Sequence, residues 1–198
     1  MSKKFLETIK IEDGKIFHLS YHQRRVEEVF HSFGKSGMLH LEEFIENIPP
    51  EGLYRCRVVY DLALRVWVEF IPYVKREVKT LKPIFDDSIS YDKKYLNREV
   101  IDALFGEKGN CDDILIVKNG FICDTSIANI ALYDNNHWVT PKEPLLKGTT
   151  RRRYIEEGLL EEKEIKFGDI GNFSKIALMN AMIDFDIIPK DNLEDILC

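Results

Sequence analysis

Tight-turn dipeptides between apolar segments constrain the fold of this chain most. Asp13-Gly14 separates an extended segment, residues 5–11, from a strand expected at 15–19. An Asp-Gly pair between alternating apolar residues is a strong signal for a β-hairpin. Two further turn pairs occur later in the chain, Asn119-Gly120 and Asn135-Asn136. The sequence therefore predicts paired strands in both halves of the chain.

The remaining segments alternate irregularly between helical and extended patterns. In the first half we expect a helix capped by Ser20 with Val26, Val29 and Phe30 on its apolar face, a short helix at 39–49 and two paired strands at 54–74. In the second half we expect a helix that ends at Gly106, a strand within 113–120 and two strands within 121–141. A helix after Gly148 and a closing strand from 174 complete the expected elements. The composition changes near residues 85–90. We therefore expect an α+β fold of two subdomains, 1–88 and 89–198, with a ligand cleft between them.

Composition excludes several classes of function. The 198 residues carry a net charge of −6 with acidic residues spread throughout, so nucleic acid is not an expected partner. No apolar stretch is long enough to span a membrane, and the N-terminus lacks a signal-peptide core. The four cysteines show no CxxC spacing, so we expect reduced thiols, no metal site and a cytoplasmic protein.

Two adjacent lysines, Lys93 and Lys94, stand where a charged segment turns into a helix. Most such pairs are solvated surface residues, and that interpretation is favoured when the stretch is considered alone. The alternative is that one lysine points inward and performs covalent chemistry.

Two further segments could bind an anion. Gly148, Thr149 and Thr150 precede a helix whose exposed N–H groups and positive dipole end suit a phosphate, although the threonines could equally serve as helix caps. His22 and Arg25 are three residues apart on one helical face. An arginine there can bind a phosphate or a carboxylate through two hydrogen bonds, although a solvent-exposed arginine is the commoner case.

Asp124 lies among apolar neighbours in "FICDTSIANI". A carboxylate in such a place needs a partner, because burying an unpaired charge is unfavourable. A protonated pyridine nitrogen is one partner, and the backbone N–H groups of Thr125 and Ser126 are another. Together, a lysine, an anion site, an arginine and a buried carboxylate are what pyridoxal phosphate requires.

Five segments in order along the chain carry a resemblance to a known family. They are "LETIKIEDGKIFHLSYHQRR" (6–25), "KYLNR" (94–98), "CDTSIANI" (123–130), "LLKGTTR" (145–151) and "LMNAMID" (178–184). The chain resembles the class IV aminotransferases, pyridoxal-phosphate enzymes that include branched-chain and D-amino-acid aminotransferases and aminodeoxychorismate lyase. Each match is moderate by itself, and the ordered set is specific.

The resemblance implies a role for individual residues. Lys94 would be the catalytic lysine that forms a Schiff base with pyridoxal 5'-phosphate, and Lys93 its solvated neighbour. Asp124 would contact the pyridine nitrogen, and Leu146 would pack against the ring. The phosphate would be held by Arg25, Gly148, Thr149, Thr150 and the backbone at Asn180 and Ala181. The implied fold is the two-subdomain fold type IV of D-amino-acid and branched-chain aminotransferases, usually a homodimer, with the cofactor between the subdomains.

The arginine that ends "KYLNR" and the segment "MNAMID" are most similar to the lyase branch. That branch converts 4-amino-4-deoxychorismate into 4-aminobenzoate and pyruvate in folate biosynthesis. The alternatives are an aminotransferase for branched-chain or D-amino acids, a truncated cofactor-binding homologue without catalysis, and a plain interaction domain.

The sequence departs from the family pattern in three places. Asp124 stands where the family usually has glutamate, and Leu6 replaces an aromatic residue. The family's N-terminal strand and its lead-in are missing, and the C-terminal end is clipped, so a shortened N-terminal subdomain is expected.

Overall fold

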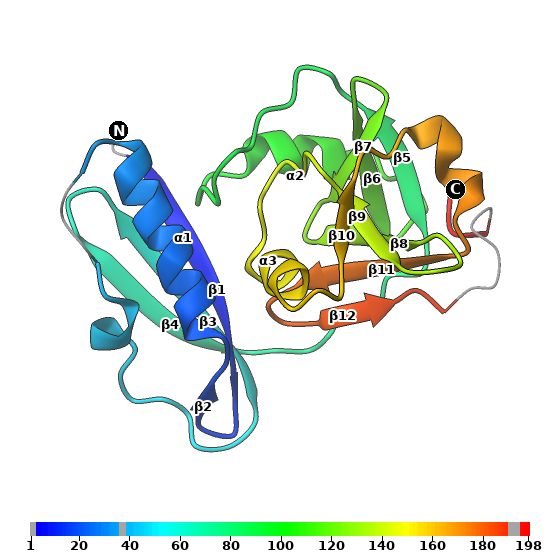
Figure 1. Cartoon of the computed structure of the whole chain (residues 1–198). Coiled ribbons are helices and arrows are strands. Elements are labelled where there is room, and N and C mark those ends of the chain that lie inside the picture. The colour runs from blue at the N-terminus through cyan, green and yellow to red at the C-terminus, as the bar shows by residue number, and fades with distance from the viewer. Residues whose placement is uncertain (1–2, 36–38, 190–194) are drawn as a thin grey trace. The chain divides into compact units, whose positions relative to one another are not determined.

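The computed structural model describes residues 3–35, 39–189 and 195–198, and the chain forms two compact units (Figure 1). The N-terminal unit comprises Met1–Lys75 and Lys93–Asn97. The C-terminal unit comprises Arg76–Asp92 and Arg98–Cys198. The chain thus returns to the N-terminal unit for five residues, whereas the sequence suggested a single boundary after residue 88.

The N-terminal unit is built on an antiparallel sheet of order β2-β1-β3-β4. Its strands are β1 (Lys4–Glu12), β2 (Lys15–Ile16), β3 (Leu53–Asp61) and β4 (Val66–Pro72). Asp13 and Gly14 both adopt positive φ, 48° and 75°, as the tight turn between β1 and β2 requires. The predicted hairpin is confirmed, although β2 is shorter than the expected strand at 15–19.

Helix α1 (Leu19–Ser32) packs on this sheet through Val26, Val29 and Phe30, as its apolar spacing predicted. These side chains meet a layer of strand residues: Phe5, Ile9, Ile11, Cys56, Val58 and Tyr60. The predicted Ser20 cap is wrong, because the N-cap is His18, two residues earlier, with φ 55°. The helix expected at 39–49 is only one 3₁₀ turn, η1 (Leu41–Phe44).

The short segment Lys93–Asn97 pairs with the N-terminal part of β1. The Leu6 N–H donates to the Lys94 carbonyl at 2.9 Å, and the Leu96 N–H donates to the Lys4 carbonyl at 2.9 Å. Phe5 and Tyr95 form an antiparallel bridge between these bonds. The backbone of Lys94 is therefore fixed to a strand almost ninety residues earlier in the chain.

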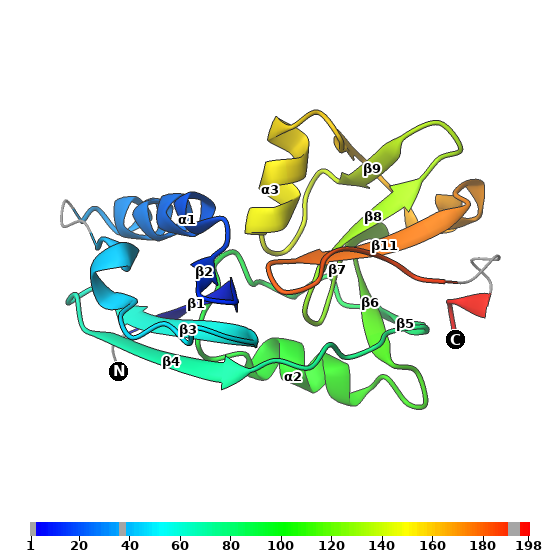
Figure 2. The same ribbon diagram turned by 90° about the horizontal axis from the view of Figure 1, so that it is seen from below.

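The C-terminal unit contains an eight-stranded mixed sheet (Figure 1). Six strands follow the order β10-β9-β8-β7-β6-β5, and β11 pairs with β12 and with β8, beside which Figure 2 shows it. Its strands are β5 (Leu81–Phe85), β6 (Asp113–Lys118), β7 (Phe121–Thr125), β8 (Asn129–Tyr133), β9 (Trp138–Pro141), β10 (Glu161–Lys163), β11 (Lys175–Asn180) and β12 (Asp184–Ile187). Its helices are α2 (Glu99–Gly106), α3 (Thr149–Glu156) and the 3₁₀ helix η2 (Phe167–Asn172). Within residues 3–35, 39–189 and 195–198, no helix is long and apolar enough to cross a membrane.

Two predictions for this unit are wrong. Residues 121–141 hold three strands rather than two, because the chain also turns between Thr125 and Asn129. The expectation of four reduced cysteines fails for Cys111 and Cys198, which the structure joins in a disulfide; Cys56 and Cys123 are free and buried. The strand β5 was not expected from the sequence.

A buried ionic cluster fixes α1 to β1. Glu7 is fully buried on the face of β1 that also carries Phe5 and Ile9. Its carboxylate accepts hydrogen bonds from Arg25 Nε at 2.8 Å and Arg25 Nη2 at 2.5 Å. His22 Nδ1 lies 2.6 Å from the same carboxylate. Burial alone would raise the pKa of Glu7, but Arg25 and His22 outweigh it and hold the pKa at about 2.

We expect Glu7→Gln to lower the free energy of unfolding at pH 7 by about 3–5 kcal/mol, because it leaves the Arg25 charge buried without its counterion. Since the pKa of Glu7 falls from 4.5 to about 2 on folding, the contribution is present above pH 4.5 and is lost as pH falls toward 2. The difference between wild type and variant should therefore shrink over that interval. Urea titrations at several pH values measure it.

Glu12→Gln is the matched control, since Glu12 lies on the same strand in a half-exposed pair with Lys10. Its effect should stay within about 0.5 kcal/mol. Equal effects of the two substitutions would show that the Glu7 cluster does not hold α1 to the sheet.

Candidate functional site

Asp124 lies on β7 directly opposite Asn129 on β8, and both side chains are buried. The Asn129 amide donates to Asp124 Oδ1 at 2.6 Å, and the backbone N–H of Leu146 donates to Asp124 Oδ2 at 2.9 Å. The alternative in which Asp124 caps a turn through Thr125 and Ser126 is wrong. Those two N–H groups donate instead to the Ala128 carbonyl and to the Asp113 carboxylate.

The acid–base state of Asp124 follows from this environment. Burial raises the pKa of Asp124 to about 7, and the hydrogen bonds from Leu146 and Asn129 with the charge of Arg151 only partly offset that rise. The protonated and the ionised forms of the carboxyl are therefore both accessible near neutral pH. A cation placed against it would favour the ionised form, so this position suits a protonated ring nitrogen.

The loop that contacts Asp124 leads into α3. Gly148, which has no side chain, occupies the N-cap of α3, so the alternative in which Thr149 and Thr150 cap the helix is wrong. Both threonines lie buried in the first turn, and no acidic side chain belongs to that turn. The first N–H groups of a helix have no partners within it. This end of α3 therefore has the donors and the dipole that a phosphate needs.

Asn180 ends β11, the strand that packs against α3. Its Oδ1 accepts hydrogen bonds from the N–H groups of Met182 at 2.9 Å and Ile183 at 3.1 Å. Its Nδ2 donates to the Ile127 carbonyl at 3.2 Å. The side chain of Asn180 thus fixes the turn that contains Ala181, whose backbone was predicted to contact phosphate.

Lys94 and Arg25 belong to the N-terminal unit. Lys94 is half-buried, and its positive charge helps to lower the pKa of His22, which burial lowers most. Arg25 is buried against Glu7, so the solvent-exposed alternative is wrong. Two of its three guanidinium nitrogens donate to Glu7.

Lys93 is half-buried rather than solvated, with its ammonium 5.7 Å from the ring centre of Phe33.

Hydrogen bonds connect three of the predicted site residues of the C-terminal unit. Asp124, Leu146 and Gly148 are linked by hydrogen bonds in the C-terminal unit, and Lys94 lies near the cluster of Arg25 in the N-terminal unit. Asn129 and Glu7 both stand in segments that carry the family resemblance, but the sequence analysis assigned neither of them a role. The alternation in "FLETIKI" was a signal for Glu7, because it places this charge on the apolar face of the strand.

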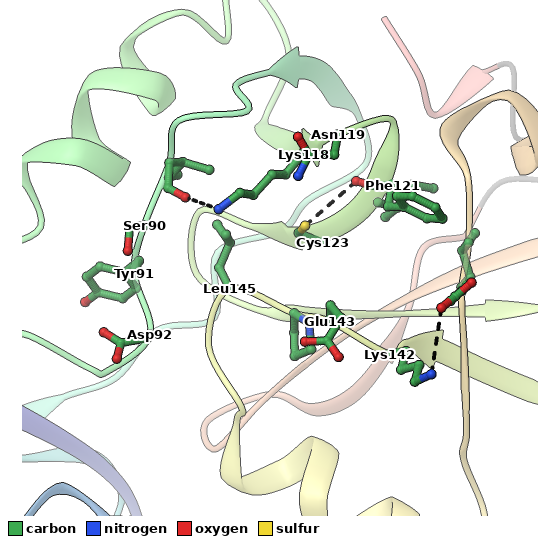
Figure 3. Close-up of a pocket in the computed structure, with 15 residues that line it drawn as sticks. Ser90, Tyr91, Asp92, Lys118, Asn119, Phe121, Cys123, Lys142, Glu143 and Leu145 are labelled. Atoms are coloured by element: carbon green, nitrogen blue, oxygen red, sulfur yellow. Dashed lines mark hydrogen bonds and ion pairs between the residues drawn. The ribbon is translucent and has the colours of Figure 1, made fainter. Parts of the chain in front are cut away.

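A separate pocket of about 410 Å³ lies in the C-terminal unit (Figure 3). Its wall includes Cys123 and Leu145, the sequence neighbours of Asp124 and Leu146. Burial raises the pKa of Cys123 to about 11, so its thiol stays protonated at neutral pH. The Lys118 ammonium in the same wall donates to the Ile89 carbonyl at 2.6 Å. The predicted site residues do not line this pocket.

The described part of the chain contains no group of three or more His, Cys, Asp or Glu side chains that could hold a metal ion.

The chain matches one family model and is similar in sequence to a bacterial protein. The sequence model of the family described as "Amino-transferase class IV" matches residues 93–188. An uncharacterized protein of Haemophilus influenzae is 38% identical over 181 residues, which cover 89% of this chain and 96% of that protein.

Two solved structures share the fold. The crystal structure of a putative 4-amino-4-deoxychorismate lyase from Haemophilus somnus is 34% identical, with a TM-score of 0.84, covering 92% of this chain and 97% of that one. A hypothetical aminotransferase from Mycobacterium tuberculosis in its PLP-bound form has a TM-score of 0.79 at 15% identity, covering 96% of this chain and 82% of that one. The predicted α+β fold and the predicted class, a pyridoxal-phosphate enzyme, are confirmed. The chain belongs to the class IV aminotransferase family.

Proposed function

We propose that this protein is a lyase that uses pyridoxal 5'-phosphate to convert 4-amino-4-deoxychorismate into 4-aminobenzoate and pyruvate. The observation that carries the proposal is the buried Asp124 carboxyl, whose partners tie it to the loop that begins α3. An acid for a ring nitrogen and an anion site at a helix start lie in one hydrogen-bonded network. The similarity to the Haemophilus somnus protein supports the lyase over other members of the family.

The residues of the C-terminal unit fit the cofactor. Asp124 uses both oxygens for hydrogen bonds, and an ionised carboxylate retains further lone pairs for a ring N–H. Its aspartate side chain replaces the longer glutamate of the family, and the loop at Leu146 closes against it. Gly148, Thr149 and Thr150 supply the start of α3 for the phosphate, together with the turn at Asn180 and Ala181. When bound, the cofactor withdraws electrons from the substrate carbon that loses its proton.

The N-terminal unit supplies the amine. The Lys94 carbonyl accepts a hydrogen bond from β1, and the Leu96 N–H two residues later donates one to β1, which restricts where the Lys94 side chain reaches. A neutral lysine amine is the base that would remove a proton from the substrate ring and return it to the departing pyruvate. Arg25, kept in place by Glu7, has its third guanidinium nitrogen outside the bonds to that carboxylate and would contact the phosphate.

An aminotransferase is the second candidate function. In that reaction the same amine would move a proton from the substrate α-carbon to the cofactor, and a keto acid would be released. Arg98, the arginine that ends the "KYLNR" segment, favours the lyase by resemblance. Its Nη2 donates to the Ser126 carbonyl at 2.8 Å, beside the strand that carries Asp124.

The family resemblance also leads us to propose a cytoplasmic homodimer that contributes to folate biosynthesis. Sedimentation of the purified protein would measure the dimer directly.

Addition of pyridoxal phosphate should give a visible absorption band that Lys94→Ala abolishes and Lys93→Ala keeps, because only Lys94 is expected to bond to the cofactor. Borohydride reduction followed by peptide mass spectrometry should locate the added mass on Lys94. Label on Lys93, or an unchanged band in Lys94→Ala, would contradict the assignment.

Asp124→Asn should weaken catalysis at least about tenfold, because the amide cannot hold the ring nitrogen protonated.

In the cofactor-free protein the same change should raise stability at alkaline pH. The pKa of Asp124 rises from 3.8 to about 7 on folding, so the wild type loses stability as pH increases through this interval.

The stability difference between Asp124→Asn and wild type should therefore grow between pH 4 and pH 7, by at most about 4 kcal/mol. Urea titrations across that range measure it. Asp169→Asn, which alters an exposed carboxylate of the same unit, should show neither effect. A difference that is independent of pH would refute the raised pKa of Asp124.

Product analysis separates the two reactions. Incubation with chorismate, an ammonia donor and an aminodeoxychorismate synthase should yield 4-aminobenzoate and pyruvate in equal amounts. If only exchange of amino groups with added keto acids is detected, the protein is an aminotransferase. If neither reaction occurs although the absorption band forms, the protein binds the cofactor without catalysis.

A further inference from the structure

The side chain of Asn129 bonds to two separate parts of the C-terminal unit at once. Its Nδ2 donates to Asp124 Oδ1 at 2.6 Å and to the Leu146 carbonyl at 2.7 Å. Its Oδ1 accepts the Gly148 N–H at 3.1 Å. A primary amide has two N–H donors and one carbonyl oxygen. Both donors and the oxygen of Asn129 are therefore engaged, one toward the acid and two toward the loop before α3.

Gly148 shows how closely the loop approaches Asn129. Its backbone has φ −69° and ψ 150°, which any residue adopts, so the conformation does not require glycine. A Cβ atom at this position would instead lie 2.0 Å from Asn129 Oδ1, and the three nearest heavy atoms all belong to Asn129. The glycine is needed because the amide of Asn129 fills the space that a side chain would take.

We propose that Asn129 is a positioning residue that holds the Asp124 carboxylate and the phosphate-binding loop in one fixed relation. The inference rests on the proposed function, since it concerns the same cofactor site. Because Asn129 donates to Asp124, it favours the ionised carboxylate that the ring nitrogen needs. Because it also binds the loop on both sides of Lys147, it fixes the distance between the acid and the start of α3.

The strand pairing of β8 does not account for this side chain. The backbone of Asn129 pairs with Asp124 on one side and Met179 on the other, and an alanine would keep these strand neighbours. The buried amide is thus specific to the connection between Asp124 and the loop.

A double-mutant cycle tests the connection through Gly148. In the wild-type background, Gly148→Ala should weaken the affinity for pyridoxal phosphate at least about tenfold, because its methyl group displaces the Asn129 amide from its partners. In an Asn129→Ala background, the same change should weaken it further by less than about threefold, since the clash is gone. Additive losses in affinity would overturn the proposal.

Thermal unfolding of the cofactor-free protein repeats the cycle without any dependence on function. Gly148→Ala should lower the Tm by about 5 °C or more in the wild type, and by much less in Asn129→Ala. If the protein binds no pyridoxal phosphate but the Tm cycle remains non-additive, the proposed function fails while the role of Asn129 in joining the acid to the loop stands. An additive Tm cycle removes that role.

The pKa of Asp124, measured by carboxyl ¹³C NMR on the cofactor-free protein, gives a readout that a purely structural role of Asn129 would leave unchanged. Asn129→Ala should raise this pKa by about one unit, because the carboxylate loses a donor. Asn136→Ala, an exposed asparagine in the turn between β8 and β9, should leave it unchanged. An unchanged pKa in Asn129→Ala would overturn the proposal.

Asn129→Asp keeps the test decisive if Asn129→Ala does not fold. It keeps the oxygen that accepts from Gly148 but loses the two Nδ2 donors to Asp124 and Leu146, so the affinity for pyridoxal phosphate should fall as in Asn129→Ala. It also places a second carboxylate next to Asp124, which should raise the pKa of Asp124 as well. An unchanged affinity for pyridoxal phosphate together with an unchanged pKa of Asp124 in Asn129→Asp would contradict the proposal.

Discussion

The hydrogen bonds of one buried carboxyl, that of Asp124, organise the proposed cofactor site of the C-terminal unit. Burial disfavours the ionised form of Asp124, and the hydrogen bonds donated by Asn129 and Leu146 offset part of this unfavourable free energy. The pKa of Asp124 consequently lies near neutrality, where a cationic partner determines its ionisation. The same donors bring the loop before α3 against β7 and β8. Acid strength and loop position therefore have a common origin.

The N-terminal unit meets a similar problem with the opposite outcome. Glu7 is as deeply buried as Asp124, but it faces Arg25 and His22 rather than neutral amides. A full positive charge at hydrogen-bonding distance outweighs desolvation, so the pKa of Glu7 falls while that of Asp124 rises. Glu7 is ionised at neutral pH and has a structural role, whereas the ionisation of Asp124 can respond to what binds beside it.

Local features of the fold could be predicted from sequence, because short segments determine them. The turns at Asp13-Gly14 and Asn119-Gly120 both have the positive φ values that their residues favour. Features that depend on distant partners could not be predicted. The sequence around Asn129 does not predict that its amide binds Gly148, nineteen residues later. The sequence around Lys94 does not predict that its backbone pairs with β1. Strand β5 contains Pro83, which weakens its extended pattern and is tolerated because only β6 pairs with it among the described strands.

The return of Lys93–Asn97 to the N-terminal unit bears on how such a protein can be divided by evolution. The chain passes from one unit to the other three times, so no single cut in the gene separates them. A fragment ending at Lys75 would leave the backbone edge of β1 around Phe5 without its partner segment. Such an unpaired edge can form hydrogen bonds with strands of other molecules. The remaining fragment, 76–198, would contain Lys94 in an internal segment, residues 93–97, that has lost the strand with which it pairs. Neither unit can therefore be removed as one continuous segment with all of its strand pairs intact.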